Sequence, residues 1–186
     1  MNFDLFTFGE SLSVFISTDT DSVLTAHNYE RVTAGAEVNV AVALSRLGLK
    51  SQFFSRFGQD QLGDVMLKDI AAEGVDISTV KRVPFFTGAM VRNPGKDAPV
   101  ETTYLRKGSA ASTIEPADIK DEFINNARWI HTTGITCAIS ESGAKSVAHA
   151  LIRANALGVK SSFDLNLRRK LWSDEAAAKT LNPLAN

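Results

Sequence analysis

The chain of 186 residues carries 21 acidic and 20 basic side chains, a formal net charge of −1, and 44% hydrophobic residues. This balance is ordinary for a soluble globular protein, either one large domain or a piece of a longer chain, and it lacks the basic face that a nucleic-acid partner needs. No apolar run approaches the roughly 18 residues of a membrane span, and the N-terminal MNFDLFTFGE lacks the features of a signal peptide. The single cysteine, Cys137, excludes an internal disulfide, so we expect a cytoplasmic protein.

Short strands precede the first helix. Residues 4–8 alternate weakly and end at Gly9, and residues 14–16 and 29–33 have the composition of further strands. Because no helix separates them, we expect a small antiparallel unit here rather than a βαβ step.

The stretch over residues 34–63, AGAEVNVAVALSRLGLKSQFFSRFGQDQLG, organises the rest of the chain. Its alanines, valines and leucines predict a helix over residues 37–47 that ends before Gly48 and, being apolar on nearly every face, is buried against a sheet. The small-residue entry at Gly35 leaves backbone amides at the helix N-terminus free for an electron-rich ligand, and Asn39 can read hydroxyls there. The alternative is an ordinary buried helix that follows a turn.

The middle of the chain continues the βα pattern and then changes character. Residues 51–57 predict a strand, apolar spacing over residues 62–70 predicts a helix closed by a glycine, and residues 80–82 predict a short strand. Residues 86–92 and 100–106 then have the pattern of two strands joined by NPGKDAP, a turn of proline and glycine. This hairpin is either a binding flap or a plain edge hairpin.

The βα pattern resumes toward the C-terminus. We expect strands over residues 127–132 and 159–163, a helix over residues 142–157, and a last helix that begins at Asp174 and is stopped by Pro183. The whole pattern predicts an α/β fold with a parallel sheet and a β-rich insertion.

Ligands of such folds gather outside the carboxyl ends of the parallel strands. Three polar loops leave strands at that edge, namely the entry at Gly35, residues 132–136 and residues 164–169. Their convergence predicts a small-molecule site. Arg106 and Arg168 offer planar paired donors suited to a carboxylate or a phosphate, although a lone arginine is more often a surface residue.

Glu37, at the start of the first helix, either complements the helix dipole or holds a polyol hydroxyl. The motifs GxGxxG, GxxxxGK[ST] and GxSxG are absent, which disfavours a dinucleotide-binding fold, a P-loop enzyme and a serine hydrolase. The histidines have no metal-ligand spacing, so we expect no metal site in this chain. Cys137 has no evident base beside it and is a poor candidate nucleophile.

The motif AGAEVNVAVALSRLG, followed by FGQDQLG, resembles the N-terminal signature of the ribokinase-like (PfkB) family of carbohydrate kinases. The resemblance continues through YLRKGSA, TTGIT and DLNLRRKLW, and therefore covers the whole chain. Within the family these segments look most like 2-keto-3-deoxygluconate kinases, which transfer the γ-phosphate of ATP to a hydroxyl of a sugar acid. The resemblance implies a mostly parallel sheet flanked by helices, with a small β-sheet lid formed by about residues 11–34 and 84–108 and an α/β core formed by the remainder of residues 1–186.

The resemblance also assigns site residues. It implies substrate binding by the helix entry and by side chains of the hairpin and the last loop: Gly35, Ala36, Glu37, Val38, Asn39, Met90, Tyr104, Arg106 and Arg168. Met90 stands where sugar-acid kinases tend to have a tyrosine. The resemblance places Asn166 and Arg168 toward ATP. It implies Mg²⁺, which neutralises the phosphate charge. It also implies that the lid pairs with a second subunit.

Two departures from the family pattern bear on function. Many fructose- and ribose-specific relatives have an aspartate a few residues after Gly9, where this chain offers Ser11 and Ser13, which weakens the neutral-sugar interpretation. The glycine-rich loop with the catalytic aspartate is expected beyond residue 186, so we expect no catalytic residue in this chain and no phosphorylation by it alone. A fructokinase or other sugar kinase, and a truncated non-catalytic binding or dimerising module, remain the alternatives.

Overall fold

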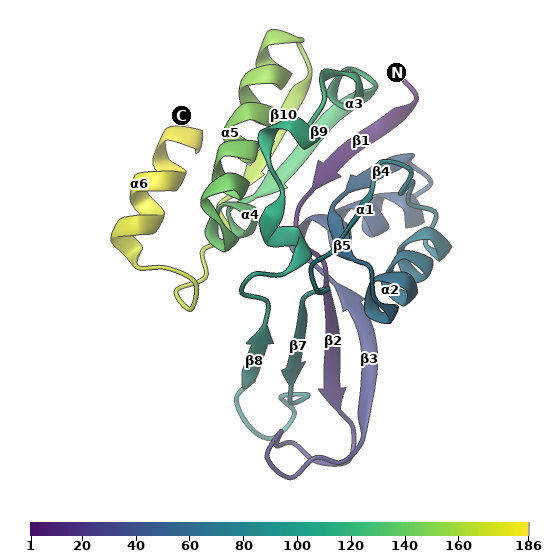
Figure 1. Ribbon diagram of the computed structural model, residues 1–186, viewed down its shortest axis with the longest axis vertical. Helices are drawn as coiled ribbons and strands as arrows, with labels where there is room; N and C mark the ends of the chain where they lie inside the picture. The colour runs from purple at the N-terminus through teal and green to yellow at the C-terminus, as the bar shows by residue number, and fades with distance from the viewer. Residues whose placement is uncertain (186) are drawn as a thin grey trace.

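A computed structural model describes residues 1–185, which form a three-layered α/β body and a second sheet that projects from it (Figure 1). The main sheet has the order β10-β9-β1-β4, and its strands all pair in parallel. Its strands are β1 (Phe3–Phe8), β4 (Ser51–Phe54), β9 (Ala127–Thr133) and β10 (Lys160–Asp164). The predicted α/β fold with a parallel sheet is therefore confirmed.

Both faces of the main sheet are covered by helices. Side chains alternate along a strand, so Leu5 and Phe6 point to opposite faces. Leu5 packs in a cluster with residues of α1 (Ala36–Arg46) and α2 (Gln61–Ala72), whereas Phe6 packs in a cluster with residues of α5 (Glu141–Ala156). The second face also carries α3 (Asp121–Asn125), α4 (Gly134–Ile139) and α6 (Asp174–Ala185).

Glycines end three of these helices, as the sequence predicts. Gly48, Gly74 and Gly158 follow α1, α2 and α5 and have φ values of 83°, 80° and 69°. Only glycine adopts this left-handed conformation without a steric penalty, so each helix ends where its glycine stands.

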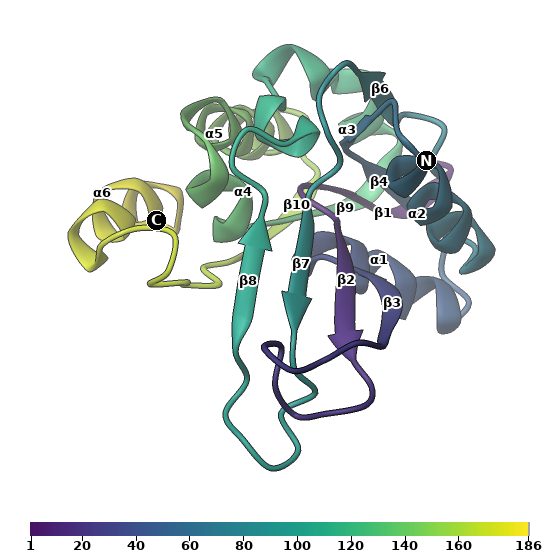
Figure 2. The ribbon, with the colours of Figure 1, turned by 60° about the horizontal axis from the view of Figure 1, so that its bottom comes forward.

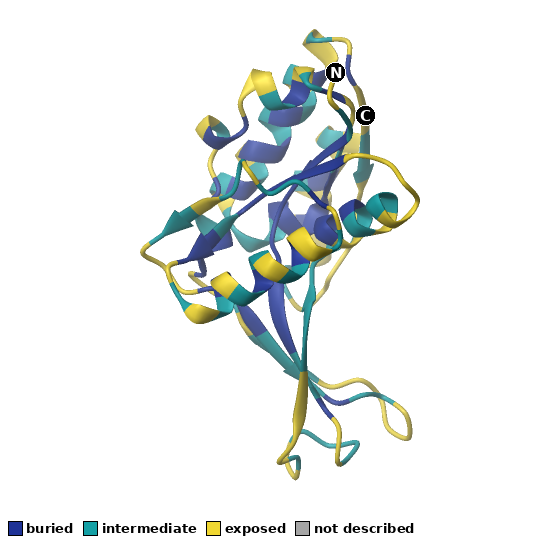
Figure 3. Ribbon diagram, turned by 90° about the vertical axis from the view of Figure 1, so that its right-hand side faces the viewer, coloured by how far each residue is buried: buried dark blue, intermediate teal, exposed yellow. Residues whose placement is uncertain are grey.

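The second sheet has the order β3-β2-β7-β8, and its strands lie side by side in Figure 2. They are β2 (Leu12–Ser17), β3 (Tyr29–Ala34), β7 (Ala89–Arg92) and β8 (Thr102–Leu105). The expected pairs β2–β3 and β7–β8 are both antiparallel, while β2 joins the two pairs by lying parallel to β7. The loops at the far end of this sheet are largely exposed (Figure 3). Asp21, in the loop between β2 and β3, accepts hydrogen bonds from the backbone amides of residues 95–98, in the loop between β7 and β8.

The structure corrects four sequence-based expectations. The predicted strand 51–57 is two strands, because β5 (Arg56–Gly58) leaves the main sheet and pairs with β6 (Lys81–Val83). The loop expected after β9 is the short helix α4, which begins at an N-cap threonine. Pro183 does not stop α6 but lies inside it, where the missing N–H removes a single hydrogen bond near the helix end.

The fourth correction concerns α1, which is not buried on every side. Only Glu37, Val38 and Ala41 are buried, because α1 covers the β1–β4 side of the sheet and leaves its flanks open. On one flank Val40 and Leu44 line a groove of about 290 Å³ together with Trp129 of β9. None of the helices within residues 1–185 is both long and apolar enough to span a bilayer.

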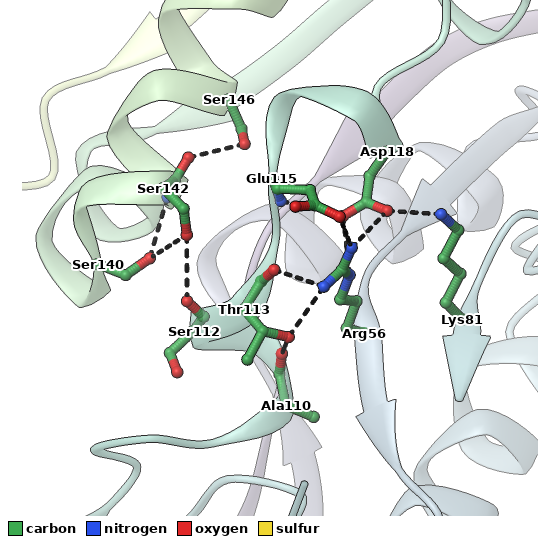
Figure 4. A network of polar contacts seen from close by, with 11 residues as sticks. Arg56, Lys81, Ala110, Ser112, Thr113, Glu115, Asp118, Ser140, Ser142 and Ser146 are labelled. Carbon is green, nitrogen blue, oxygen red and sulfur yellow. Dashed lines mark hydrogen bonds and ion pairs between the residues drawn. The ribbon is translucent and has the colours of Figure 1, made fainter. Parts of the chain in front are cut away.

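A network of ion pairs fixes the segment by which the chain returns from the second sheet to the body (Figure 4). This segment contains the 3₁₀ helices η1 (Ala110–Thr113) and η2 (Pro116–Asp118). The fully buried carboxylate of Asp118 lies 2.8 Å from Arg56 Nε and 2.7 Å from Lys81 Nζ. Burial alone would raise the pKa of Asp118, but the hydrogen bonds from Arg56 and Lys81 hold it below its usual value. Asp118 therefore joins η2 to both β5 and β6.

Replacing Asp118 by asparagine is expected to lower the free energy of unfolding by about 2 kcal/mol at pH 7, because charged hydrogen bonds from two basic side chains become weaker. Urea unfolding of the two proteins measures the difference. Glu122→Gln is the matched control, since its carboxylate pairs with Lys120 at an exposed site and contributes little. Equal midpoints for the wild type and Asp118→Asn would contradict the role assigned to Asp118.

Candidate functional site

The candidate site lies at the junction between the two sheets, at the carboxyl end of the main sheet. The chain passes from one sheet to the other between β1 and β2 and leaves the second sheet again between β3 and α1. Glu10 stands at the first passage and Gly35 at the second. A Cβ on Gly35 would collide with the backbone oxygen of Glu10, so the two passages are in direct contact. Since Gly35 has a φ of 174°, it is lack of space, not backbone conformation, that requires glycine.

The first turn of α1 is joined to the end of β9 through Glu37. Its Oε1 accepts hydrogen bonds from Thr133 Oγ1 at 2.8 Å and from Thr136 Oγ1 at 2.7 Å. Thr133 also caps α4 by accepting a hydrogen bond from the amide of Ile135. Burial raises the pKa of Glu37 to about 7, against the opposing effect of the two threonine hydroxyls. One buried carboxyl therefore orients the N-termini of two helices.

The carboxyl group of Glu37 lies against Gly9, which directly follows β1. Glu37 Oε2 is buried and has no hydrogen-bond partner among the described residues. A Cβ on Gly9 would collide with this carboxyl group, so Gly9 provides the space that the carboxyl occupies. A buried carboxylate oxygen that receives no hydrogen bond makes the ionised form of Glu37 unfavourable. This agrees with a Glu37 carboxyl that holds its proton near neutral pH.

Arg106 reaches the same junction from the end of β8. Its guanidinium forms an ion pair with the carboxylate of Glu10, and the two side chains are 10% and 1% exposed. Ser109 Oγ donates to Glu10 Oε1 at 3.4 Å, and the guanidinium carbon of Arg106 lies 5.1 Å from the ring centre of Tyr104. Burial raises the pKa of Glu10 to about 7, although Arg106 and Ser109 act in the opposite direction.

The hydrogen-bonding capacity of Arg106 is not exhausted by these contacts. Its Nε is buried and lacks a hydrogen-bond acceptor among the residues described, whereas Nη2 is held by the ion pair with Glu10. Buried donors are nearly always satisfied in folded proteins. Nε is therefore the donor left for an acceptor supplied by a ligand.

Tyr104 and Met90 lie directly opposite each other on β8 and β7, and Met90 in turn lies opposite Val14 of β2. Residues paired in this way share a face of the sheet. The register thus places the predicted side chains Met90 and Tyr104 next to each other, and Arg106, just past the end of β8, packs against the Tyr104 ring.

The loop that follows β10 completes the junction. A Cβ on Gly134 would collide with the backbone oxygen of Leu165, so this loop lies against the start of α4. Asn166 has a left-handed φ of 40°, and its amide donates to Asp164 Oδ1 at 2.9 Å. Arg168 is exposed, and the one hydrogen bond found for its side chain is to the neighbouring backbone oxygen of Leu167. The structure therefore brings the three predicted loops together, with Arg168 at the solvent side.

The remaining predicted residues differ in accessibility. Asn39 is exposed and lines a groove of about 650 Å³ between β3 and helices α1 and α2. Val38 is buried beneath it, and Ala36 is half-buried. The ligand contacts of all nine substrate residues and of Asn166 and Arg168 remain predictions.

Sequence reasoning missed Glu10, Ser109 and the two threonines that bind Glu37. Glu10 stands directly after the first strand, where a ligand-facing residue is expected, but its partner Arg106 is distant in the chain. Cys137 is buried, and burial raises the pKa of its thiol to about 12, so it carries no thiolate at neutral pH. The part of the chain that the structure describes holds no group of three histidine, cysteine or carboxylate side chains placed for a metal ion.

The parallel sheet, the projecting second sheet and the junction between them define the ribokinase-like class of α/β proteins. Residues 2–186 match the family described as pfkB family carbohydrate kinase, and the chain belongs to that family. The expected family and fold are thus confirmed.

Individual relatives show how much of the family fold is present. The chain is 36% identical over 188 residues to the 2-dehydro-3-deoxygluconokinase of Bacillus subtilis (strain 168), covering 100% of this chain and 58% of that protein. It is 31% identical to the probable fructokinase-5 of Arabidopsis thaliana, covering 96% and 56%. The crystal structure of a PfkB protein from Polaromonas sp. JS666 superposes with a TM-score of 0.94 at 37% identity, over 98% of this chain and 63% of that one. The chain thus spans little more than half the length of these curated relatives.

Proposed function

We propose that the chain forms the sugar-binding part of an ATP-dependent kinase that phosphorylates a hydroxyl of a sugar acid, 2-keto-3-deoxygluconate. The observation that carries this proposal is the buried guanidinium of Arg106, whose Nε lacks an acceptor at the junction of the two sheets. A guanidinium binds a carboxylate through paired hydrogen bonds, and a neutral hexose has no carboxylate to offer. The name of the Bacillus subtilis relative supports the same substrate, since 2-dehydro and 2-keto denote the same carbonyl group.

The proposed roles follow from accessibility. Arg106 holds the carboxylate, Tyr104 and Met90 contact the sugar from the second sheet, and Gly35 and Asn39 face its hydroxyls. The second sheet acts as the lid, because it projects over the junction on four chain passages. The side chains of Glu37 and Val38 are too deeply buried to touch a ligand, so they position the α1 entry instead.

The exposed loop is proposed to place Asn166 toward the phosphates of ATP, which supplies the transferred phosphoryl group, and Arg168 toward both the phosphates and the sugar acid. The described residues offer no cluster of metal ligands, and we expect Mg²⁺ to be held by the phosphates of ATP. The catalytic aspartate is expected outside this chain, so the chain alone is proposed not to transfer phosphate. We further infer that two copies pair through the second sheet, whose edge strand β8 leaves Leu105 55% exposed.

Calorimetric titration of the chain with 2-keto-3-deoxygluconate and with D-fructose tests the substrate class. We expect the sugar acid to bind at least tenfold more tightly, about 1.4 kcal/mol, and Arg168→Ala to weaken the acid more than fructose. Tighter binding of fructose would favour a fructokinase, the second candidate, which the 31% identity to a probable fructokinase supports. A coupled ADP assay of the chain should show no turnover. Light scattering should give twice the mass of the chain. Binding without turnover by a chain that is monomeric would favour a non-catalytic binding module.

A further inference from the structure

Glu10 is a deeply buried carboxyl at the junction, and three other segments of the chain surround it. Its carboxylate pairs with Arg106 and accepts a hydrogen bond from Ser109. A Cβ on Gly88, at the start of β7, would lie 3.5 Å from Glu10 Oε1, so the carboxyl rests against both ends of the β7–β8 hairpin. The backbone oxygen of Glu10 meanwhile touches the helix entry at Gly35. Glu10 therefore holds the arginine, the hairpin and the α1 entry in one arrangement.

The charges around Glu10 nearly balance in the free protein. The charged groups that face it within residues 1–185 are the guanidinium of Arg106 and, through space, the carboxyl of Glu37. An ionised Glu10 neutralises Arg106, and burial raises the pKa of Glu37 so that it is largely uncharged below pH 7. A ligand carboxylate placed on Nε of Arg106 would add a second negative charge to one buried guanidinium. Two carboxylates that share a buried site do not both stay ionised, so one of them must take up a proton.

We propose that Glu10 is a positioning residue that sets the acid specificity of the site: it holds the Arg106 guanidinium through Nη2 and leaves Nε free, and it takes up one proton from the solvent when a sugar-acid carboxylate binds there. This inference rests on the proposed function, because it assumes that Arg106 receives the carboxylate. The ligand stays ionised on Arg106, the Glu10 carboxylate becomes a carboxylic acid, and the buried charge of the site is unchanged. A neutral sugar demands no such change.

In the free protein, Glu10 changes between its protonated and ionised forms near neutral pH. Burial raises its pKa to about 7, so at pH 8 most molecules carry an ionised Glu10 that can accept the proton. If the bound state keeps Glu10 protonated up to pH 9, linkage predicts that the Kd of the sugar acid rises about fivefold from pH 7 to pH 8. The Kd of fructose should stay constant over the same range.

Calorimetry of the chain at pH 8 in phosphate and in Tris, which differ in ionisation enthalpy, counts the protons exchanged on binding. We expect uptake of about one proton with 2-keto-3-deoxygluconate, none with D-fructose, and none with the acid when Glu10→Gln replaces the titrating group. Glu37→Gln is the matched variant, since Glu37 is the other buried carboxyl with a raised pKa, and uptake should persist in it. Binding of the acid without proton uptake, or loss of uptake in Glu37→Gln alone, would overturn the proposal.

A second measurement needs no ligand and separates this inference from the proposed function. The side-chain carboxyl ¹³C signal of Glu10 reports its titration in the free protein, and Arg106→Gln should raise the Glu10 pKa because its counter-charge is lost. If neither sugar binds, the proposed function is contradicted. The Glu10 titration then still shows whether Glu10 and Arg106 are paired. An unchanged Glu10 titration in Arg106→Gln would show that Glu10 does not pair with Arg106, and it would contradict the inference.

Discussion

Replacing Arg106 by glutamine is expected to weaken the binding of 2-keto-3-deoxygluconate about 100-fold, because the substrate carboxylate loses a buried charged partner worth about 2–5 kcal/mol. The binding of D-fructose should change by less than about threefold. Calorimetric titration measures both ligands on the same sample. Arg128→Gln is the matched control, since Arg128 pairs with Asp4 at an exposed site far along the sheet. Equal losses for the acid and for fructose would show that Arg106 supports the fold rather than reading the carboxylate.

The same substitution has a distinct effect on stability. It leaves Glu10 buried without its counter-charge, which costs about 3 kcal/mol where the carboxyl must be ionised. Burial raises the pKa of Glu10 to about 7 in the presence of Arg106, and loss of Arg106 raises it further, so the variant should lose more stability at pH 8, where the wild type holds an ionised Glu10, than at pH 6, where both proteins hold it protonated. The double variant Glu10→Gln with Arg106→Gln should recover most of the loss at pH 8, as urea unfolding can measure.

Glu37→Gln is expected to remove a large part of the pH dependence of stability. The pKa of Glu37 in the folded protein, about 7, lies above its ordinary value of 4.5, so the folded state binds this proton more tightly than the unfolded state. The resulting stability is fully present below about pH 4.5 and is lost as the pH rises through 7, a decrease of about 3 kcal/mol by pH 8. Glutamine does not titrate, so the free energy of unfolding of the variant should be flatter over this range.

Glu37→Ala separates the hydrogen bonds of this carboxyl from its titration. Alanine leaves the hydroxyls of Thr133 and Thr136 without their shared acceptor and opens a cavity between α1 and α4. We expect a loss of about 3 kcal/mol at pH 5, where glutamine should cost much less. Similar stabilities for the alanine and glutamine variants at pH 5 would contradict the assigned role of Glu37.

Much of the fold could be predicted because its signals are local. The helix ends follow from Gly48, Gly74 and Gly158, whose positive φ needs no information from the rest of the chain. The β7–β8 hairpin follows from its proline–glycine turn, and the parallel sheet from the alternation of strands and helices. The family motif at residues 34–63 likewise lies in one continuous stretch of the sequence.

The misplaced boundaries and burial have a different origin. Pro183 lies within a helix because the turns before it hold α6 together, and no rule about proline alone includes them. The apolar residues of α1 resemble those of a fully buried helix, but their exposure depends on which elements pack around them. The sequence pattern shows which side chains favour burial, and only the neighbours decide how much area is covered.

By itself the sequence determined the class of fold, the family, the three loops that form the junction and the arginine suited to a carboxylate. Only the tertiary structure showed that Glu10 pairs with Arg106, and that Glu37 binds Thr133 and Thr136, which lie 96 and 99 positions away in the chain. Local patterns record backbone preferences, whereas the charge state of a buried carboxyl depends on desolvation and on partners within a few ångströms. Those partners are brought together by the folding of the whole chain, so the electrostatics of the junction could be described only once the fold was known.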